Sequence, residues 1–134
     1  MKWDDTKYGV ITEKIIEIFF IVHNKLGPGF SEKAYHLAVL KELRKKFNNV
    51  ESEKQMPVYY DDEVLIYYIP DVVVEDSIII EVKAVTELND NHKAQIISQL
   101  RASKILVGLL VNFAENKVIF KRIDNFYEII KQGL

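Results

Sequence analysis

Two stretches near the start of the chain carry apolar residues at helical spacing. In the first stretch the apolar positions are Ile11, Ile15, Ile18, Phe19, Val22 and Leu26. This spacing predicts a helix of about four turns, which Gly27-Pro28-Gly29 ends. A second helix is predicted to begin at Ser31, a suitable N-cap, and to run to about Phe47. Its basic C-terminal end suits the negative end of the helix dipole.

After the second helix the apolar pattern changes to short runs of β-forming residues. These runs cover residues 55–60, 64–69, 71–75 and 78–82, with turn-forming residues between them. Their spacing predicts consecutive strands of an antiparallel meander. A third helix is predicted from about Asn91 to Ser103, followed by strands at 105–113 and 117–123. This order predicts an α/β fold with a mixed central sheet flanked by helices.

Composition narrows the class of protein. The 134 residues suit a single domain over 1–134, and 49% hydrophobic with 28% charged residues is typical of a globular chain. A net charge of -2 provides no overall positive field, so any nucleic acid must be bound locally. With no cysteine, thiolate metal sites and disulfides are excluded. No membrane span or signal peptide is recognisable, so we expect a cytoplasmic protein with no membrane partner.

The pair of strands at 71–75 and 78–82 carries the clearest chemical signal. Strand alternation places Glu81 and Lys83 on one face, with the apolar residues between them on the other. If residues 75–77 form a three-residue loop, positions 74 and 78 pair and Asp71 lies opposite Glu81. Two facing carboxylates repel each other, but they suit a divalent cation held by oxygen ligands.

This inference depends on the assumed loop, because a two-residue loop would move Asp71 off the face of Glu81. A solvent-exposed charge pair is the alternative for the short Glu81-Val82-Lys83 motif. The surrounding run VVVEDSIIIEV, however, is too apolar for a strand that is exposed on one side. Acidic residues within such a run therefore favour a functional site.

Glu32 is a further candidate, at the start of the second helix. It shares a helical face with Tyr35, His36 and Val39, which belong to the face turned toward the core. An acid at the head of a buried stripe needs a cation or hydrogen bonds. The position is equally consistent with a solvated first-turn glutamate that the helix dipole favours.

Other polar residues give weaker signals. His23 and His92 are expected to be structural or surface residues, whereas His36, one turn from Glu32, could line the pocket. Two groups of basic residues could contact a phosphate backbone, although solvated faces are the simpler interpretation. These groups are Lys41, Arg44, Lys45 and Lys46, and Lys117, Lys121 and Arg122. Four strand tyrosines suit cross-strand packing or stacking on bases. They are Tyr59, Tyr60, Tyr67 and Tyr68.

The segment Gly29-Phe30-Ser31-Glu32-Lys33-Ala34-Tyr35, preceded by HNKLGPG, resembles the signature of the GxxExxY family. That family is assigned to the PD-(D/E)XK nuclease superfamily. The resemblance covers roughly residues 11 to 124, including IPDVVVEDSIIIEVKAV, AQIISQLRAS and GLLVNF. It implies the restriction-endonuclease-like fold of these nucleases.

The resemblance also implies roles for individual residues. Asp71 and Glu81 correspond to metal-binding acids, Lys83 to the catalytic lysine and Glu32 to the acid of the early helix. Gln95 matches a glutamine on the helix after the core. Related nucleases often have Gln-x-x-x-Tyr there, whereas this chain has Gln95 followed by Gln99. Tyr35 completes the family signature and is expected to orient Glu32 or to pack.

These residues predict a Mg²⁺- or Mn²⁺-dependent nuclease, because such an ion neutralises phosphate charge and lowers the pKa of bound water. The expected partner is nucleic acid, DNA rather than RNA. Two alternatives use the same fold: a nucleic-acid-binding module without turnover, and a protein-interaction domain. In the latter, the tyrosine-rich strands could supply the interface of a homodimer.

Overall fold

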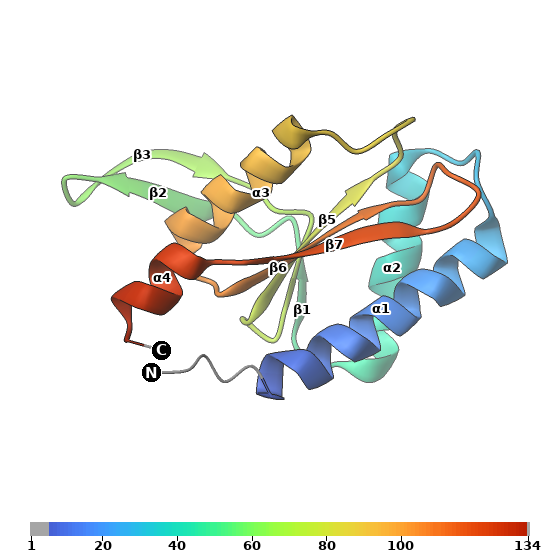
Figure 1. Cartoon of the computed structure of the whole chain (residues 1–134), viewed down its shortest axis with the longest axis horizontal. Helices are drawn as coiled ribbons and strands as arrows, with labels where there is room; N and C mark the ends of the chain where they lie inside the picture. The colour runs from blue at the N-terminus through green and yellow to red at the C-terminus, as the bar shows by residue number, and fades with distance from the viewer. Residues whose placement is uncertain (1–5, 134) are drawn as a thin grey trace.

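The computed structural model describes residues 6–133 (Figure 1). In chain order its elements are α1 (Thr6–Leu26), α2 (Glu32–Lys46), β1 (Val50–Ser52), β2 (Met56–Tyr60), β3 (Glu63–Tyr68), β4 (Val72–Val74), β5 (Ile78–Lys83), α3 (Asp90–Ser103), β6 (Val107–Asn112), β7 (Ile119–Asp124) and α4 (Phe126–Lys131). Residues 1–5 and 134 lie outside the described residues, so a single domain over 1–134 stays a prediction. No helix within residues 6–133 has the length and apolar character needed to cross a bilayer.

A five-stranded mixed sheet lies at the centre, in the order β1-β4-β5-β6-β7. Only β5 and β6 are parallel, and α3 connects them, whereas the other neighbours are antiparallel. The α/β fold with a mixed sheet flanked by helices is therefore confirmed. The three predicted helices form, and α1 begins several residues earlier than the apolar pattern indicated.

The two faces of the central sheet are buried by different helices. Alternate residues of β5, namely Ile78, Ile80 and Val82, contact the core formed with α1 and α2. Ile79 faces the opposite way, into a smaller core with Ile96 of α3. All residues of β4 and the apolar residues of β5 are buried, as expected for strands covered on both sides.

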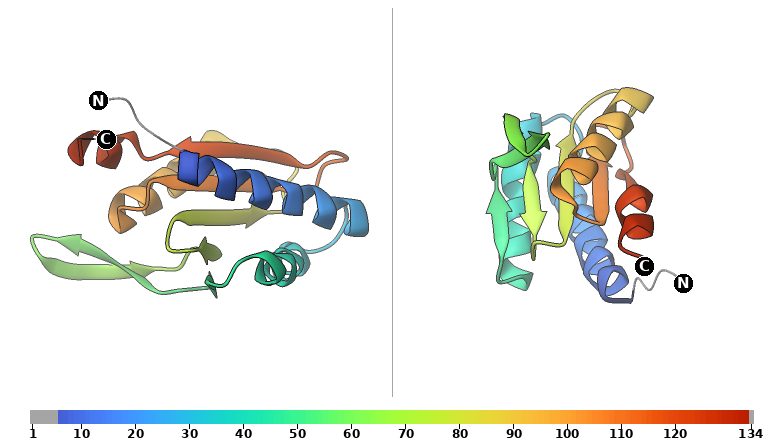
Figure 2. Two further views of the ribbon diagram at one scale, coloured as in Figure 1. Left: turned by 90° about the horizontal axis from the view of Figure 1, so that it is seen from below. Right: turned by 90° about the vertical axis from the view of Figure 1, so that its left-hand side faces the viewer.

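The predicted four-strand meander is wrong. Strands β2 and β3 form a separate two-stranded hairpin, which extends beyond the central sheet beside α3 (Figures 1 and 2). Pro70 lies directly between β3 and β4, where it cannot donate a ladder hydrogen bond, and β4 pairs instead with the short β1. The apolar pattern did not predict β1 or α4, because three and six residues are too few to show a period.

The close packing of α3 on β6 gives a test of this arrangement. A Cβ atom at Gly108 would lie 2.9 Å from Cδ1 of Ile96 and 3.2 Å from Cδ1 of Leu100. We expect Gly108→Ala to destabilise the fold by about 1–3 kcal/mol through overpacking. Urea unfolding should show this loss, and Ile96→Val, which removes the closest methyl group, should recover part of it.

Gly9→Ala is the matched control for this substitution. Gly9 lies in α1, and a Cβ atom added there would have no neighbour within 4 Å among the described residues. The substitution should stabilise the protein by up to about 1 kcal/mol through helix propensity. Equal effects of the two substitutions would contradict the close approach of α3 to β6.

Candidate active site

The hairpin of β4 and β5 places Asp71 beside Glu81. Val74 pairs with Ile78 and Val72 with Ile80, so the next position outward sets Asp71 opposite Glu81. The loop has three residues, as predicted, and Glu75 and Asp76 adopt positive φ angles of 52° and 51°. Two such residues in succession are typical of tight hairpin turns. The register that the chemical argument required is therefore confirmed.

Two reciprocal hydrogen bonds hold these acids together. The amide of Asp71 donates to Oε1 of Glu81 at 3.2 Å. In return, the amide of Val82, next to Glu81, donates to Oδ2 of Asp71 at 2.7 Å. In each bond a single oxygen of the Glu81 or Asp71 carboxylate accepts the hydrogen bond. The backbone of each strand thus fixes the acid of the other at the point where the pairing of β4 ends.

Glu81 is buried, with 5% of its surface exposed, and this environment alters its acidity. Burial, together with the negative charge of Asp71, raises its pKa to about 8, while the Asp71 amide and the positive charge of Lys83 oppose the rise. The pair therefore does not hold two full negative charges at neutral pH without a cation. A divalent cation would favour the ionised form of both acids.

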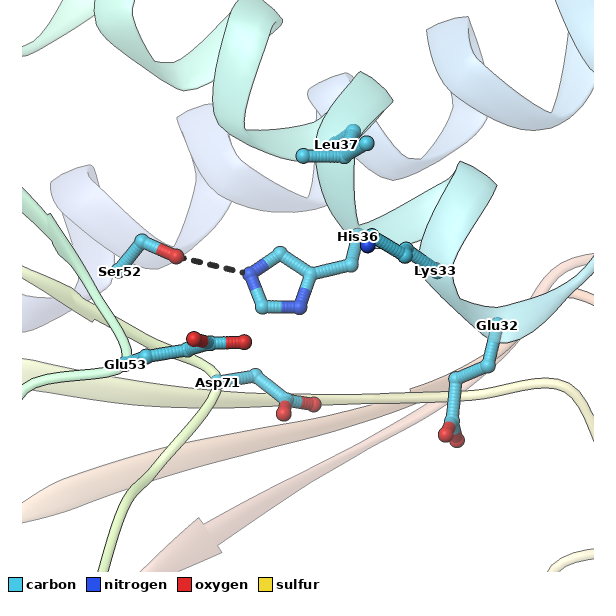
Figure 3. A pocket seen from close by; sticks show the side chains of 7 residues that line it. All are labelled: Glu32, Lys33, His36, Leu37, Ser52, Glu53 and Asp71. Carbon is cyan, nitrogen blue, oxygen red and sulfur yellow. Dashed lines mark hydrogen bonds between the residues drawn. The ribbon is translucent and has the colours of Figure 1, made fainter.

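Asp71 also opens into a pocket of about 450 Å³. Its lining residues are Glu32, Lys33, His36 and Leu37 from α2, Ser52 and Glu53 from the end of β1, and Asp71 (Figure 3). Figure 3 shows the Asp71 and Glu53 carboxylates below the imidazole of His36, with Glu32 farther along the same hollow. Glu32, His36 and Asp71 are thus brought to one cavity from segments far apart in the sequence.

The start of α2, which carries Glu32, is fixed by Tyr35. The Tyr35 hydroxyl donates to the carbonyl of Gly27 at 2.5 Å and accepts from the amide of Phe30 at 3.2 Å. Its ring stacks on Phe113 with centroids 4.9 Å apart. Gly29 has a positive φ of 109°, which favours glycine in this turn. Tyr35 is fully buried, and its contacts hold the turn that precedes α2.

Four pocket residues were not among the sequence candidates, and three of them are polar: Lys33, Ser52 and Glu53. The Nε2 atom of His36 is hydrogen-bonded to Oγ of Ser52 at 3.1 Å, which orients the ring. Glu53 has a positive φ of 53°, uncommon for a residue other than glycine, and its amide donates to the carbonyl of Asp71 at 3.1 Å. The segment ESEK has the composition of a solvated loop, so the sequence held no signal for it.

The candidates do not form one compact set of ligands. Within residues 6–133, no group of three or more His, Asp or Glu side chains is arranged to hold a metal ion. Glu81 follows Ile79 on the face covered by α3, whereas the exposed Glu32 comes from α2 on the opposite face. Asp71 lies where the two faces meet at the end of β4. Lys83 lies two residues beyond Glu81 on the same face, half-buried.

The remaining candidates lie elsewhere. Gln95 is exposed on α3 and lines a different pocket, against the β2–β3 hairpin. His23 is buried and its Nε2 atom is hydrogen-bonded to the carbonyl of Glu115 at 2.8 Å. His92 caps α3, since its Nδ1 atom accepts from the amide of Asn89. The structural roles expected for His23 and His92 are confirmed.

The sequence also matches a model of a known protein superfamily. A sequence model described as the PD-(D/E)XK nuclease superfamily matches residues 9–123. The chain therefore belongs to the PD-(D/E)XK nuclease superfamily. Nucleases of this superfamily generally use divalent metal ions and act on nucleic acid.

A solved structure supports the fold. The crystal structure titled SSO0001 is similar with a TM-score of 0.57 and 21% sequence identity, covering 75% of this chain and 55% of that chain. This chain thus spans about half the length of that protein. The low identity supports a shared fold alone. No curated protein matches the sequence significantly.

The burial of Glu81 predicts how stability depends on pH. The pKa of Glu81 is about 8 in the folded protein against an ordinary value of 4.5. Between these values the folded state holds a proton that the unfolded state has lost. Metal-free protein should therefore become less stable as the pH rises through this window, by at most about 1.4 kcal/mol per pH unit.

Urea unfolding in a chelator, at intervals from about pH 5 to pH 8, measures this slope. Glu81→Gln carries no titrating group at this position and should flatten the slope. If the wild type and Glu81→Gln changed in parallel over this range, Glu81 would not have the raised pKa.

Proposed function

We propose that this chain is a metal-dependent nuclease that hydrolyses phosphodiester bonds, with DNA as its substrate. The observation that carries the proposal is the pairing of Asp71 with the buried Glu81 across β4 and β5. The pocket that Asp71 shares with Glu32 supports it. The segment from Gly29 to Tyr35 further supports membership of the GxxExxY family within the superfamily.

The two acids fit a hard divalent cation such as Mg²⁺ or Mn²⁺. Mg²⁺ is commonly bound by one or two carboxylates together with waters and substrate phosphates. Asp71 and Glu81 supply two neighbouring carboxylates, and each has an oxygen outside the reciprocal backbone bonds. Burial and the nearby charge of Asp71 disfavour the ionised form of Glu81. A bound cation would offset the repulsion between the two carboxylates. When bound, the ion would neutralise phosphate charge and lower the pKa of the attacking water.

Three further residues near the Asp71–Glu81 pair have proposed roles in the reaction. Lys83 supplies a positive charge on the face of Glu81, where it orients the attacking water or stabilises the negative charge of the phosphate. Glu32, across the pocket from Asp71, orients a water or takes part in a ligand shell that the substrate completes. His36, held by Ser52, can hydrogen-bond to a phosphate oxygen in the same pocket.

The substrate must be held by local contacts, because the chain carries a net charge of -2. Lys33 is an exposed cation at the pocket itself. The two other basic groups do not line this pocket. They are Lys41, Arg44, Lys45 and Lys46, farther along α2, and Lys117, Lys121 and Arg122, on and before β7, where Arg122 is bonded to Asp124. We therefore place the scissile phosphate at the Asp71 pocket, between α2 and the end of β4.

The test is a cleavage assay with labelled single- and double-stranded DNA and RNA, with Mg²⁺, with Mn²⁺ and with a chelator. Asp71→Asn and Glu81→Gln retain acceptors for the two backbone amides but remove the negative charges. Each should slow metal-dependent cleavage at least about a hundredfold, because the metal's stabilisation of the transition state is worth several kcal/mol.

Asp62→Asn, which removes an exposed acid at the tip of the β2–β3 hairpin, is the matched control and should leave the rate unchanged. Cleavage that persists in both Asp71→Asn and Glu81→Gln would place the chemistry elsewhere. Metal binding without cleavage of any substrate would favour the alternative of a nucleic-acid-binding domain without turnover.

A further inference from the structure

A second pocket lies between the β2–β3 hairpin and α3, which are neighbours in Figure 1. It has a volume of about 390 Å³. Its lining residues are Val58, Ile66 and Tyr68 from the hairpin, and Gln95, Ser98, Gln99 and Ala102 from α3. All of these side chains are uncharged. The pocket therefore suits a neutral and largely apolar group.

Gln99, one of the residues that line this pocket, has an unpaired hydrogen-bond acceptor. The side chain is 8% exposed, and its Oε1 atom is buried with no hydrogen-bond partner within residues 6–133. Buried acceptors in native proteins are nearly always paired, because an unpaired one loses its contact with water without compensation. Gln99 lines the pocket, so a ligand that brings an N–H donor would supply the missing bond once the amide turns toward the pocket.

A hydrogen bond holds Tyr68, which also lines the pocket, against α3. The hydroxyl of Tyr68 donates to the backbone carbonyl of Gln99 at 2.8 Å, which ties the hairpin to α3. This bond fixes the position of the Tyr68 ring relative to the pocket. A half-buried aromatic ring held in this way is a surface on which a planar group can stack.

We propose that this pocket binds a nucleobase of a single-stranded nucleic acid. A nucleobase is planar and uncharged, it stacks on aromatic and aliphatic side chains, and its edge carries N–H donors that can satisfy Gln99. The inference rests on the proposed nuclease function, since it names the part of the substrate that lies beside the cleaved bond.

The pocket lies close enough to the acid pair for one strand to reach both. Tyr68 precedes Asp71 by three residues, a separation of at most about 11 Å even in a fully extended chain. Desolvation raises the pKa of the Tyr68 hydroxyl, Ser103 lowers it, and the charge of Glu81 adds to the rise. The Tyr68 hydroxyl is therefore close enough to the Glu81 carboxyl for the two groups to interact electrostatically.

The experiment compares labelled single strands of about 12 nucleotides with abasic strands of the same length and charge. Fluorescence anisotropy in a chelator measures binding without cleavage. The wild type should bind the base-bearing strand at least about fivefold more tightly, the effect of stacking one base. Ala102→Leu, which fills the pocket, should reduce its affinity to that of the abasic strand.

Two further variants separate binding from folding. Ala94→Leu, an exposed position on the same helix, is the matched control and should keep the base preference. Gln99→Leu should lose much of the preference while thermal unfolding shows no loss of stability, because it removes an unpaired buried acceptor. A purely structural Gln99 would instead lower the melting temperature and leave the preference intact.

The proposal is overturned if the wild type binds abasic and base-bearing strands equally or binds neither. It is also overturned if Ala102→Leu and Ala94→Leu have the same affinity for the base-bearing strand. An apolar dye that binds the wild type but not Ala102→Leu, and that oligonucleotides do not displace, would overturn it in favour of an apolar partner. The two proposals fail separately. A base preference without metal-dependent cleavage would refute only the proposed nuclease function. Cleavage without a base preference would refute only the proposed nucleobase pocket.

Discussion

The register of β4 against β5 is the constraint on which the candidate site depends. Three valines pair with three isoleucines, and the tight turn at Glu75 and Asp76 sets which residues face each other. A shift by one residue would turn the buried side chains of β4 to the opposite face and would separate Asp71 from Glu81. The apolar cores on both sides of the sheet therefore enforce the same alignment that brings two acids together. Packing energy holds a pair that would otherwise repel.

The sheet places the chemistry at a boundary between two layers. The helices α1 and α2 cover one face and α3 covers the other, so Glu81 and Glu32 approach the end of β4 from opposite sides. Asp71 is the residue that both sides share: it bonds to the strand of Glu81 and lines the pocket of Glu32. The β2–β3 hairpin leads into Asp71 and packs on α3, so its pocket lies beside the candidate site. A substrate strand would thus contact elements from both layers.

Much of this arrangement could be predicted from the sequence, where the signal was local. The spacing of apolar residues located α1, α2 and α3, and Ser31 caps α2 as expected. The β4–β5 register was predicted from an assumed three-residue loop at residues 75–77, and the structure has that loop. The separate hairpin was missed, since strand propensity does not specify which strand a neighbour pairs with. Glu53 was missed because its place in the pocket depends on a left-handed backbone conformation beside Asp71 that its loop-like sequence does not indicate.

The central claim is that Asp71 and Glu81 together hold a divalent cation, and its most direct test is a calorimetric titration with Mn²⁺. The titration is run near pH 7 in two buffers of different ionisation enthalpy, which reveals protons released on binding. Since the pKa of Glu81 is about 8, binding should release close to one proton, and Glu81→Gln and Asp71→Asn should weaken binding strongly. Binding of equal strength in these variants, or binding to the wild type without proton release, would contradict the account.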